Sequence, residues 1–162
     1  MWLALDLGAQ CGWATYNDER RIWDAGLWKL QGKRDSHIGS RMIVFRKYLS
    51  DVIPLGPHVV CYEKVRRHLG TAAAHAYGAY ESAVLEWSEC VGIPAVGIEV
   101  GAVKKQATGH GRATKAAVLE AARQRWTWLA IPTDDVADAL WILATAREHV
   151  GAIPTILSRG QK

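Results

Sequence analysis

Four carboxylates lie where an acid is costly unless something compensates its charge. Asp6 interrupts an apolar run at the start of the chain, and Glu63 ends a second apolar run that begins at Val59. Asp135 and Asp138 lie three residues apart among apolar neighbours. Acids in apolar surroundings need compensation, and converging carboxylates repel each other unless a divalent cation lies between them. The sequence therefore predicts a Mg²⁺ or Mn²⁺ site on a compact fold.

The spacing of these acids indicates how they could meet. Residues three apart share one face of a helix, so Asp135 and Asp138 point the same way from the start of a last helix that Thr133 would cap. Asp6 belongs to the first predicted strand, and Glu63 ends the fourth. If those strands are neighbours, the last helix can pack across them and bring the acids together. Two metal ions about 4 Å apart would then activate a water and stabilise a leaving 3′-oxygen.

Each acid also has a plain structural explanation. Asp134 and Asp135 could lie at the positive end of a helix dipole without further role. Asp6 could cap the turn at Gly8, and Glu63 could pair with the basic residues that follow it. The combination of acids is far more specific than any one of them, so we favour the metal site.

Two basic clusters lie close in sequence to these acids or to a Gly-rich turn. The net charge of +4 is modest, so the distribution of the cations is more informative than their number. A basic rim around an acidic centre suits phosphodiester cleavage, because cations hold the backbone while acids hold metal. Solvated surface charge is the alternative for either cluster alone. The clusters contain Lys64, Arg66 and Arg67, and Lys104, Lys105, Arg112 and Lys115.

Length and composition narrow the class of protein. The chain has 162 residues, of which 49% are apolar, which predicts one domain with a substantial core. No apolar run approaches the roughly 18 residues of a membrane span, and Asp6 interrupts the only stretch that could resemble a signal peptide. The three cysteines lack metal-type spacing, so we expect a reducing cytoplasm and cysteines that serve as small buried hydrophobic residues.

Hydrophobic periodicity predicts three strands, then strands separated by helices, and therefore an α/β fold with a mixed sheet flanked by helices. We expect a single domain over residues 1–150 and a loosely held tail over residues 151–162. The predicted strands are 1–7, 12–16, 21–30, 58–63 and 94–100. The predicted helices are 35–53, 71–91, 115–126, which Thr114 would cap, and one opening at 132–133, with a short helical turn at 102–107.

Together these segments resemble the RuvC family of Holliday junction resolvases, within the RNase H-like superfold. LALDLG at residues 3–8 is similar to the family's first-strand aspartate element, and VVCYEKV at 59–65 is similar to its strand-ending glutamate. VKKQATGHGRATK at 103–115 resembles the family's lysine, GxG and second lysine. DVADAL at 135–140 matches the terminal DxxDAL element.

The resemblance implies an RNase H-like five-stranded sheet and a homodimeric enzyme that nicks two opposed strands of a four-way DNA junction in recombination and repair. It implies Mg²⁺ as cofactor, with Mn²⁺ able to substitute. The Ala-rich helix at 71–91 would be a natural dimer surface. The implied metal ligands are Asp6, Glu63, Asp135 and Asp138, and the implied phosphate or transition-state contacts are Lys104 and Lys115. We expect DNA to be positioned by Arg66, Arg67, Lys105 and Arg112.

Two features depart from the bacterial pattern. Bacterial members tend to carry an aromatic residue three positions after the strand glutamate, where this chain has Arg66. The short chain and its divergent details favour a bacteriophage member, which would act in the host cytoplasm on a broader set of branched DNAs.

Other functions remain open at this point. One is an RNase H-like nuclease that acts on RNA; such relatives usually show a basic, glycine-containing segment after the first aspartate, where this chain has Ala9-Gln10-Cys11-Gly12. Another is a junction-binding protein that does not cut, against which the intact carboxylates argue. An actin-like ATPase needs a second domain, for which the length leaves no room.

Overall fold

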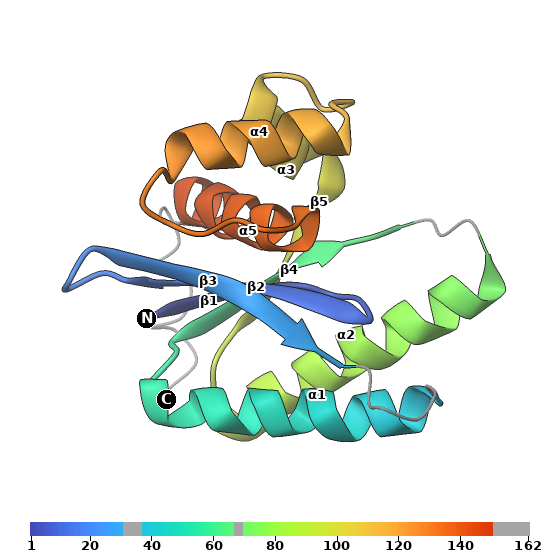
Figure 1. Ribbon diagram of the computed structural model, residues 1–162. Coiled ribbons are helices and arrows are strands. Elements are labelled where there is room, and N and C mark those ends of the chain that lie inside the picture. The colour runs from blue at the N-terminus through green and yellow to red at the C-terminus, as the bar shows by residue number, and fades with distance from the viewer. Residues whose placement is uncertain (31–36, 67–69, 151–162) are drawn as a thin grey trace.

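The computed structural model describes residues 1–30, 37–66 and 70–150. They form a five-stranded sheet between two layers of helices (Figure 1). The sheet order is β3-β2-β1-β4-β5. The strands are β1 (Trp2–Asp6), β2 (Gln10–Asn17), β3 (Ile22–Lys29), β4 (Val59–Lys64) and β5 (Ala95–Glu99). The helices are α1 (Ile38–Val52), α2 (Thr71–Val91), α3 (Val100–Thr108), α4 (Lys115–Arg125) and α5 (Asp134–Val150), with a 3₁₀ turn at Ile53–Leu55.

The sheet is mixed, as the sequence predicted. β1, β2 and β3 form an antiparallel meander, while β4 pairs with β1 in parallel and β5 pairs with β4 in parallel. A parallel pair requires a crossover connection, and α1 and α2 supply the crossovers into β4 and β5. The mixed five-stranded sheet flanked by helices confirms the predicted fold class.

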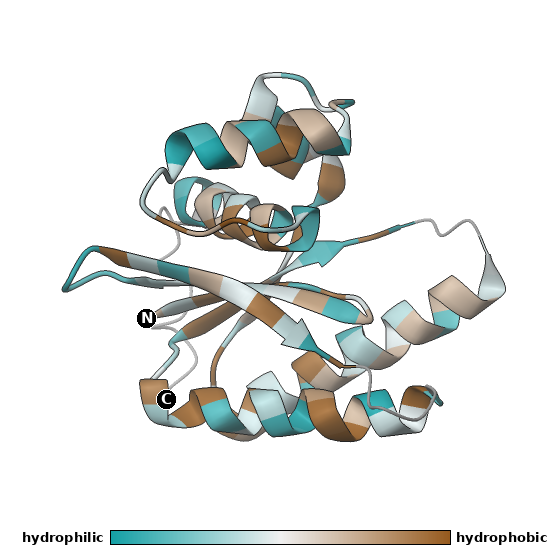
Figure 2. Ribbon diagram, viewed as in Figure 1, coloured by the Kyte–Doolittle hydropathy of each residue, from teal (hydrophilic) through white to brown (hydrophobic). Residues whose placement is uncertain are grey.

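Each face of the sheet has its own core, because alternate residues of a strand point to opposite faces. Ala4 and Cys61 point to the face that α5 covers, with α3 and α4 beyond it. Leu3 and Val60 point to the opposite face, which α1 and α2 cover. Figure 2 shows apolar segments on both helical layers alternating with polar ones, as amphipathic helices require.

Several predicted boundaries hold and two predictions need correction. α2 has the bounds predicted for the Ala-rich helix, and Thr114 caps α4 by accepting a hydrogen bond from the Ala117 amide at 3.2 Å. The short turn predicted at 102–107 is a full helix, α3, which Val103 anchors in the core and Gly109 ends with a positive φ of 80°. Cys90 is exposed rather than buried, because it lies on the outer face of α2. The predicted start of the first helix at residue 35 and the predicted tail lie outside the described residues.

No helix in the described part of the chain is long and apolar enough to cross a bilayer.

Candidate active site

The carboxyl ends of β1 and β4 place the first two acids side by side. Leu5 pairs with Tyr62 in the parallel register, so Asp6 and Glu63 are the next positions on two neighbouring strands. Their side chains follow the alternation that sends Ala4 toward the α5 face. The strand adjacency on which the predicted convergence depended is therefore present.

A glycine allows α5 to reach these acids. Gly12 in β2 pairs with Asp6 in β1. A Cβ atom on Gly12 would lie far inside contact distance of the Asp135 carbonyl and 3.0 Å from the Val136 amide nitrogen. Only a residue without a side chain lets the first turn of α5 lie this close to the sheet. The helix consequently begins beside Asp6 and carries Asp138 over the end of β1.

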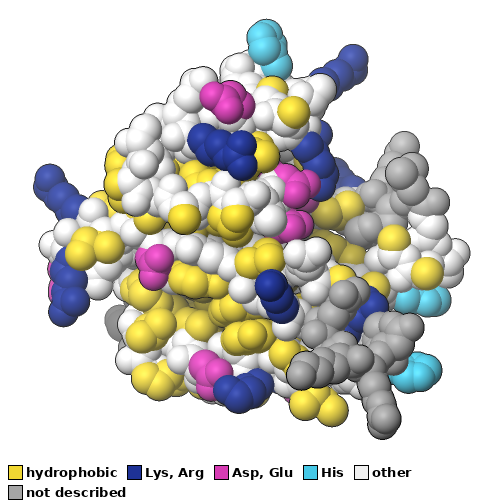
Figure 3. Space-filling model, in the orientation of Figure 1, with side chains coloured by type: hydrophobic (Ala, Val, Ile, Leu, Met, Phe, Trp, Pro, Cys, Tyr) yellow, Lys and Arg dark blue, Asp and Glu magenta, His cyan; other side chains and the backbone are white. Residues whose placement is uncertain are grey.

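Three of the four acids and two lysines line one pocket between α3, α4, α5 and the sheet. Figure 3 shows acidic and basic side chains gathered where the upper helices meet the sheet. Asp135 is not among the lining residues, although its charge acts on Asp6. The pocket is lined by Asp6, Glu63, Val100, Val103, Lys104, Lys115, Val118 and Asp138.

Burial and mutual repulsion disfavour the charged forms of these acids. Desolvation, then the charges of Asp138, Glu63 and Asp135, raise the pKa of Asp6 well above its ordinary value. Desolvation and then Asp138 raise the pKa of Glu63 to about 7. Desolvation is also the main cause that raises the pKa of Asp138 to about 6 and the pKa of Asp135 above its usual range. The protein has thus gathered negative charge at a cost that a bound cation would relieve.

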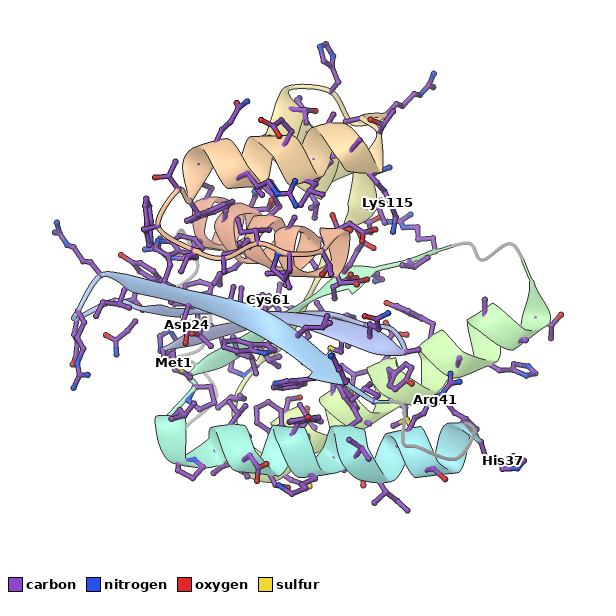
Figure 4. All side chains as sticks on the ribbon, viewed as in Figure 1. Met1, Asp24, His37, Arg41, Cys61 and Lys115 are labelled. Carbon is purple, nitrogen blue, oxygen red and sulfur yellow. The ribbon has the colours of Figure 1, made fainter. Side chains whose placement is uncertain are left out.

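Lysine charges offset part of that cost. Lys104 and Lys115 both lower the pKa of Glu63, and Lys115 also lowers that of Asp6. Figure 4 shows Lys115 at the start of α4, extending toward the oxygen atoms near the start of α5. The two lysines come from different helices, so the tertiary fold brings these cations to the acids.

Two ion pairs near the pocket were not expected from the sequence. Lys115 Nζ donates to Asp134 Oδ2 at 2.9 Å, which raises the pKa of Lys115 and lowers that of Asp134. Arg66 donates through Nε and Nη2 to Glu99 Oε1 at 3.0 and 2.7 Å. Glu99 ends β5 and pairs with Lys64, the residue after Glu63 in β4, so the pattern of an acid near a strand end could have pointed to it.

A tyrosine secures the backbone that carries Glu63. Tyr77 of α2 donates its hydroxyl hydrogen to the Glu63 carbonyl at 2.7 Å and accepts a hydrogen bond from the Val65 amide at 3.2 Å. These bonds fasten the end of β4 to α2. No sequence signal distinguished Tyr77 from a core aromatic.

The remaining predicted DNA contacts are more dispersed. Lys105 and Arg112 are exposed on and after α3, outside the pocket lining, and Arg66 is exposed beyond β4. Arg67 lies outside the described residues. Among the described residues, no three His, Cys, Asp or Glu side chains already stand in a metal-binding arrangement.

The fold is similar to that of known junction resolvases. A structure of RuvC from Thermus thermophilus superimposes with a TM-score of 0.71 at 20% identity, covering 93% of this chain and 96% of that one. T. thermophilus RuvC in complex with a Holliday junction substrate gives a TM-score of 0.72 at 21% identity, covering 92% and 93%. The yeast mitochondrial Holliday junction resolvase Ydc2 gives 0.58 at 14% identity, covering 97% and 82%. Neither a family model nor a curated protein sequence matches the chain.

Proposed function

We propose that this chain is a divalent-metal-dependent DNA endonuclease that resolves Holliday junctions and other branched DNA by paired nicks. The observation that carries the proposal is the single pocket that holds Asp6, Glu63 and Asp138 together with Lys104 and Lys115. Partly buried acids beside ammonium groups suit a site that binds a metal and a phosphate together. The similarity of the fold to RuvC and Ydc2 supports DNA junctions as the substrate.

The acids fit a magnesium site by their chemistry. Carboxylate oxygens are the hard donors that Mg²⁺ prefers, and Mn²⁺ would bind the same donors. Asp6, Glu63 and Asp138 line the pocket, and Asp135 lies close enough to perturb Asp6. When bound, the metal would polarise the scissile phosphate and supply an activated water.

The lysines would act on the phosphate itself. Lys104 and Lys115 present ammonium groups to the pocket from α3 and α4, where they would hold the nonbridging oxygens of the scissile phosphate and balance charge in the transition state. Cleavage would leave a 3′-hydroxyl and a 5′-phosphate. Lys105 and Arg112, exposed around the loop between these helices, would hold the DNA backbone.

Two further groups would extend the DNA path. Arg66 lies beyond the end of β4, on the side away from β1. Its guanidinium is paired with Glu99. Arg67, next in sequence, would make a second backbone contact. Each phosphate that such cations neutralise releases counterions, so binding should weaken steeply with salt.

A homodimer would supply the second nick. Two copies related by a twofold axis place two equivalent sites against a near-symmetric junction. The first half of α2 is rich in alanine, of which Ala72 and Ala73 are exposed, and has open space above Gly78, so a second helix could approach it closely. We place the protein in the cytoplasm, as a bacteriophage member acting in its host.

The test is cleavage of a synthetic four-way DNA junction, compared with linear duplex DNA, an RNA–DNA hybrid and single-stranded RNA. Reactions contain Mg²⁺, Mn²⁺ or EDTA, and Asp6→Asn is compared with Asp51→Asn, an exposed acid on α1 paired with Lys47. We expect paired nicks in branched DNA only, lost in EDTA and in Asp6→Asn but retained in Asp51→Asn.

Other results would contradict the proposal in distinct ways. Cutting of RNA alone would identify an RNA-processing nuclease. Tight junction binding without cutting would identify a binding protein. Cleavage that survives Asp6→Asn in a folded protein would refute the assigned site.

A further inference from the structure

The contact between Lys115 and Asp134 joins the first residue of α4 to the first residue of α5. Nζ of Lys115 lies 2.9 Å from Oδ2 of Asp134. Lys115 lines the pocket, whereas Asp134 does not. Asp134 therefore contacts the pocket through the lysine that it holds.

Lys115 does not stabilise α4, the helix that it begins. The N-terminal end of a helix carries partial positive charge and disfavours a cation, and the first turn of α4 contains no acid. Thr114 already caps this end by accepting a hydrogen bond from the Ala117 amide. Local helix stability gives no reason for a lysine here, but its position at the pocket does.

An unrestrained lysine would be a poor phosphate ligand. The Lys115 side chain is 71% exposed, and a four-carbon stem in solvent samples many rotamers. Asp134 has a short side chain, and the next residue of α5, Asp135, packs directly against Gly12 of the sheet. The carboxylate is thus a firm anchor that restricts the ammonium group to one region of the pocket mouth.

We propose that Asp134 is a positioning residue that holds the ammonium group of Lys115 where it meets the scissile phosphate. The inference rests on the proposed nuclease function and adds a residue to it. Lys104 provides a matched comparison, because it lines the same pocket from α3 and forms no ion pair with another described residue. Asp134 should therefore matter to Lys115 and not to Lys104.

The decisive experiment is a double-mutant cycle. Asp134→Ala is introduced into the 162-residue wild type, into Lys115→Met and into Lys104→Met, and single-turnover junction cleavage is measured at saturating protein. We expect Asp134→Ala to slow wild-type cleavage by roughly tenfold, to slow Lys104→Met by the same factor, and to leave Lys115→Met unchanged. Junction affinity in EDTA should change by no more than about twofold, because the pair is exposed. Asp134→Glu should restore part of the rate.

Equal losses in both lysine backgrounds would overturn the inference, since they would indicate a general effect on the fold or on the metal. Tighter junction binding by Asp134→Ala at an unchanged rate would also overturn it, because Asp134 would then compete with the phosphate for Lys115.

A second readout does not require cleavage. Acylation rates of individual lysines, measured by mass spectrometry without metal or DNA, should rise at Lys115 and not at Lys104 when Asp134 is replaced by Ala. If the wild type cuts branched DNA but Lys115 is acylated at the same rate in the wild type and in Asp134→Ala, the inference is overturned and the proposed function is not. A wild type that cuts no branched DNA would overturn the proposed function and the inference with it.

Discussion

Replacing Glu63 with Gln should stabilise the metal-free protein at pH 8 and have almost no effect near pH 4. The pKa of the Glu63 carboxyl lies at about 7 in the folded chain, against an ordinary value of 4.5, because desolvation and the neighbouring Asp138 disfavour its charge. The folded state therefore prefers the protonated form, which Gln imitates in shape and in neutrality.

The sign and size follow from proton linkage. A raised pKa means that the folded state binds more protons than the unfolded state between the two values, so stability falls as pH rises from about 4.5 through about 7. One pKa unit corresponds to about 1.4 kcal/mol, which sets an upper limit of about 3.5 kcal/mol for the full difference. Glu63 is only half-buried, and solvent screening reduces the effect, so we expect about 1–2 kcal/mol at pH 8.

The assay is urea unfolding in EDTA at pH 4, 6 and 8, with Glu19→Gln as control. Glu19 is exposed in the turn between β2 and β3, so its replacement should change the free energy of unfolding by the same small amount at every pH. A Glu63→Gln variant that is less stable than wild type at pH 8, or equally shifted at pH 4 and 8, would refute the claim that the pocket destabilises the ionised carboxylate.

Three other perturbations test the site and its supports. Gly12→Ala should lower the free energy of unfolding by about 1–3 kcal/mol and reduce junction cleavage, because the new Cβ would collide with the Asp135 carbonyl; unchanged urea unfolding would show that α5 can shift freely. Mg²⁺ should raise the Tm in the absence of DNA and EDTA should reverse the gain, with a smaller gain in Asp6→Asn; an equal gain in that variant would place the cation elsewhere. Thr114→Ala should cost about 1 kcal/mol through the lost cap of α4, measured by urea unfolding, and no loss would mean that solvent replaces the cap.

Local sequence signals determined the elements that depend on local physics. The bounds of α2 follow from its Ala-rich composition and from Gly92, which ends it with a positive φ of 72°. Thr114 and Thr133 were identifiable as caps because capping involves residues only three apart, and both side chains accept the expected amide bonds. The helix α3 was underestimated because Gly101 lowers helix propensity, while the packing of Val103 in the core compensates for it.

The sequence by itself identified Asp6, Glu63 and Asp138 as acids in unfavourable surroundings, since the cost of burying a carboxylate shows in its apolar neighbours. Only the tertiary structure decided that they share a pocket, because this depends on the parallel pairing of β1 with β4 and on the close approach of α5 at Gly12. The tertiary structure also decided which acids form ion pairs with the basic side chains. Asp134 lies 19 positions from Lys115 in the chain and Glu99 lies 33 from Arg66, and no local spacing rule connects residues that meet only when separate elements pack together.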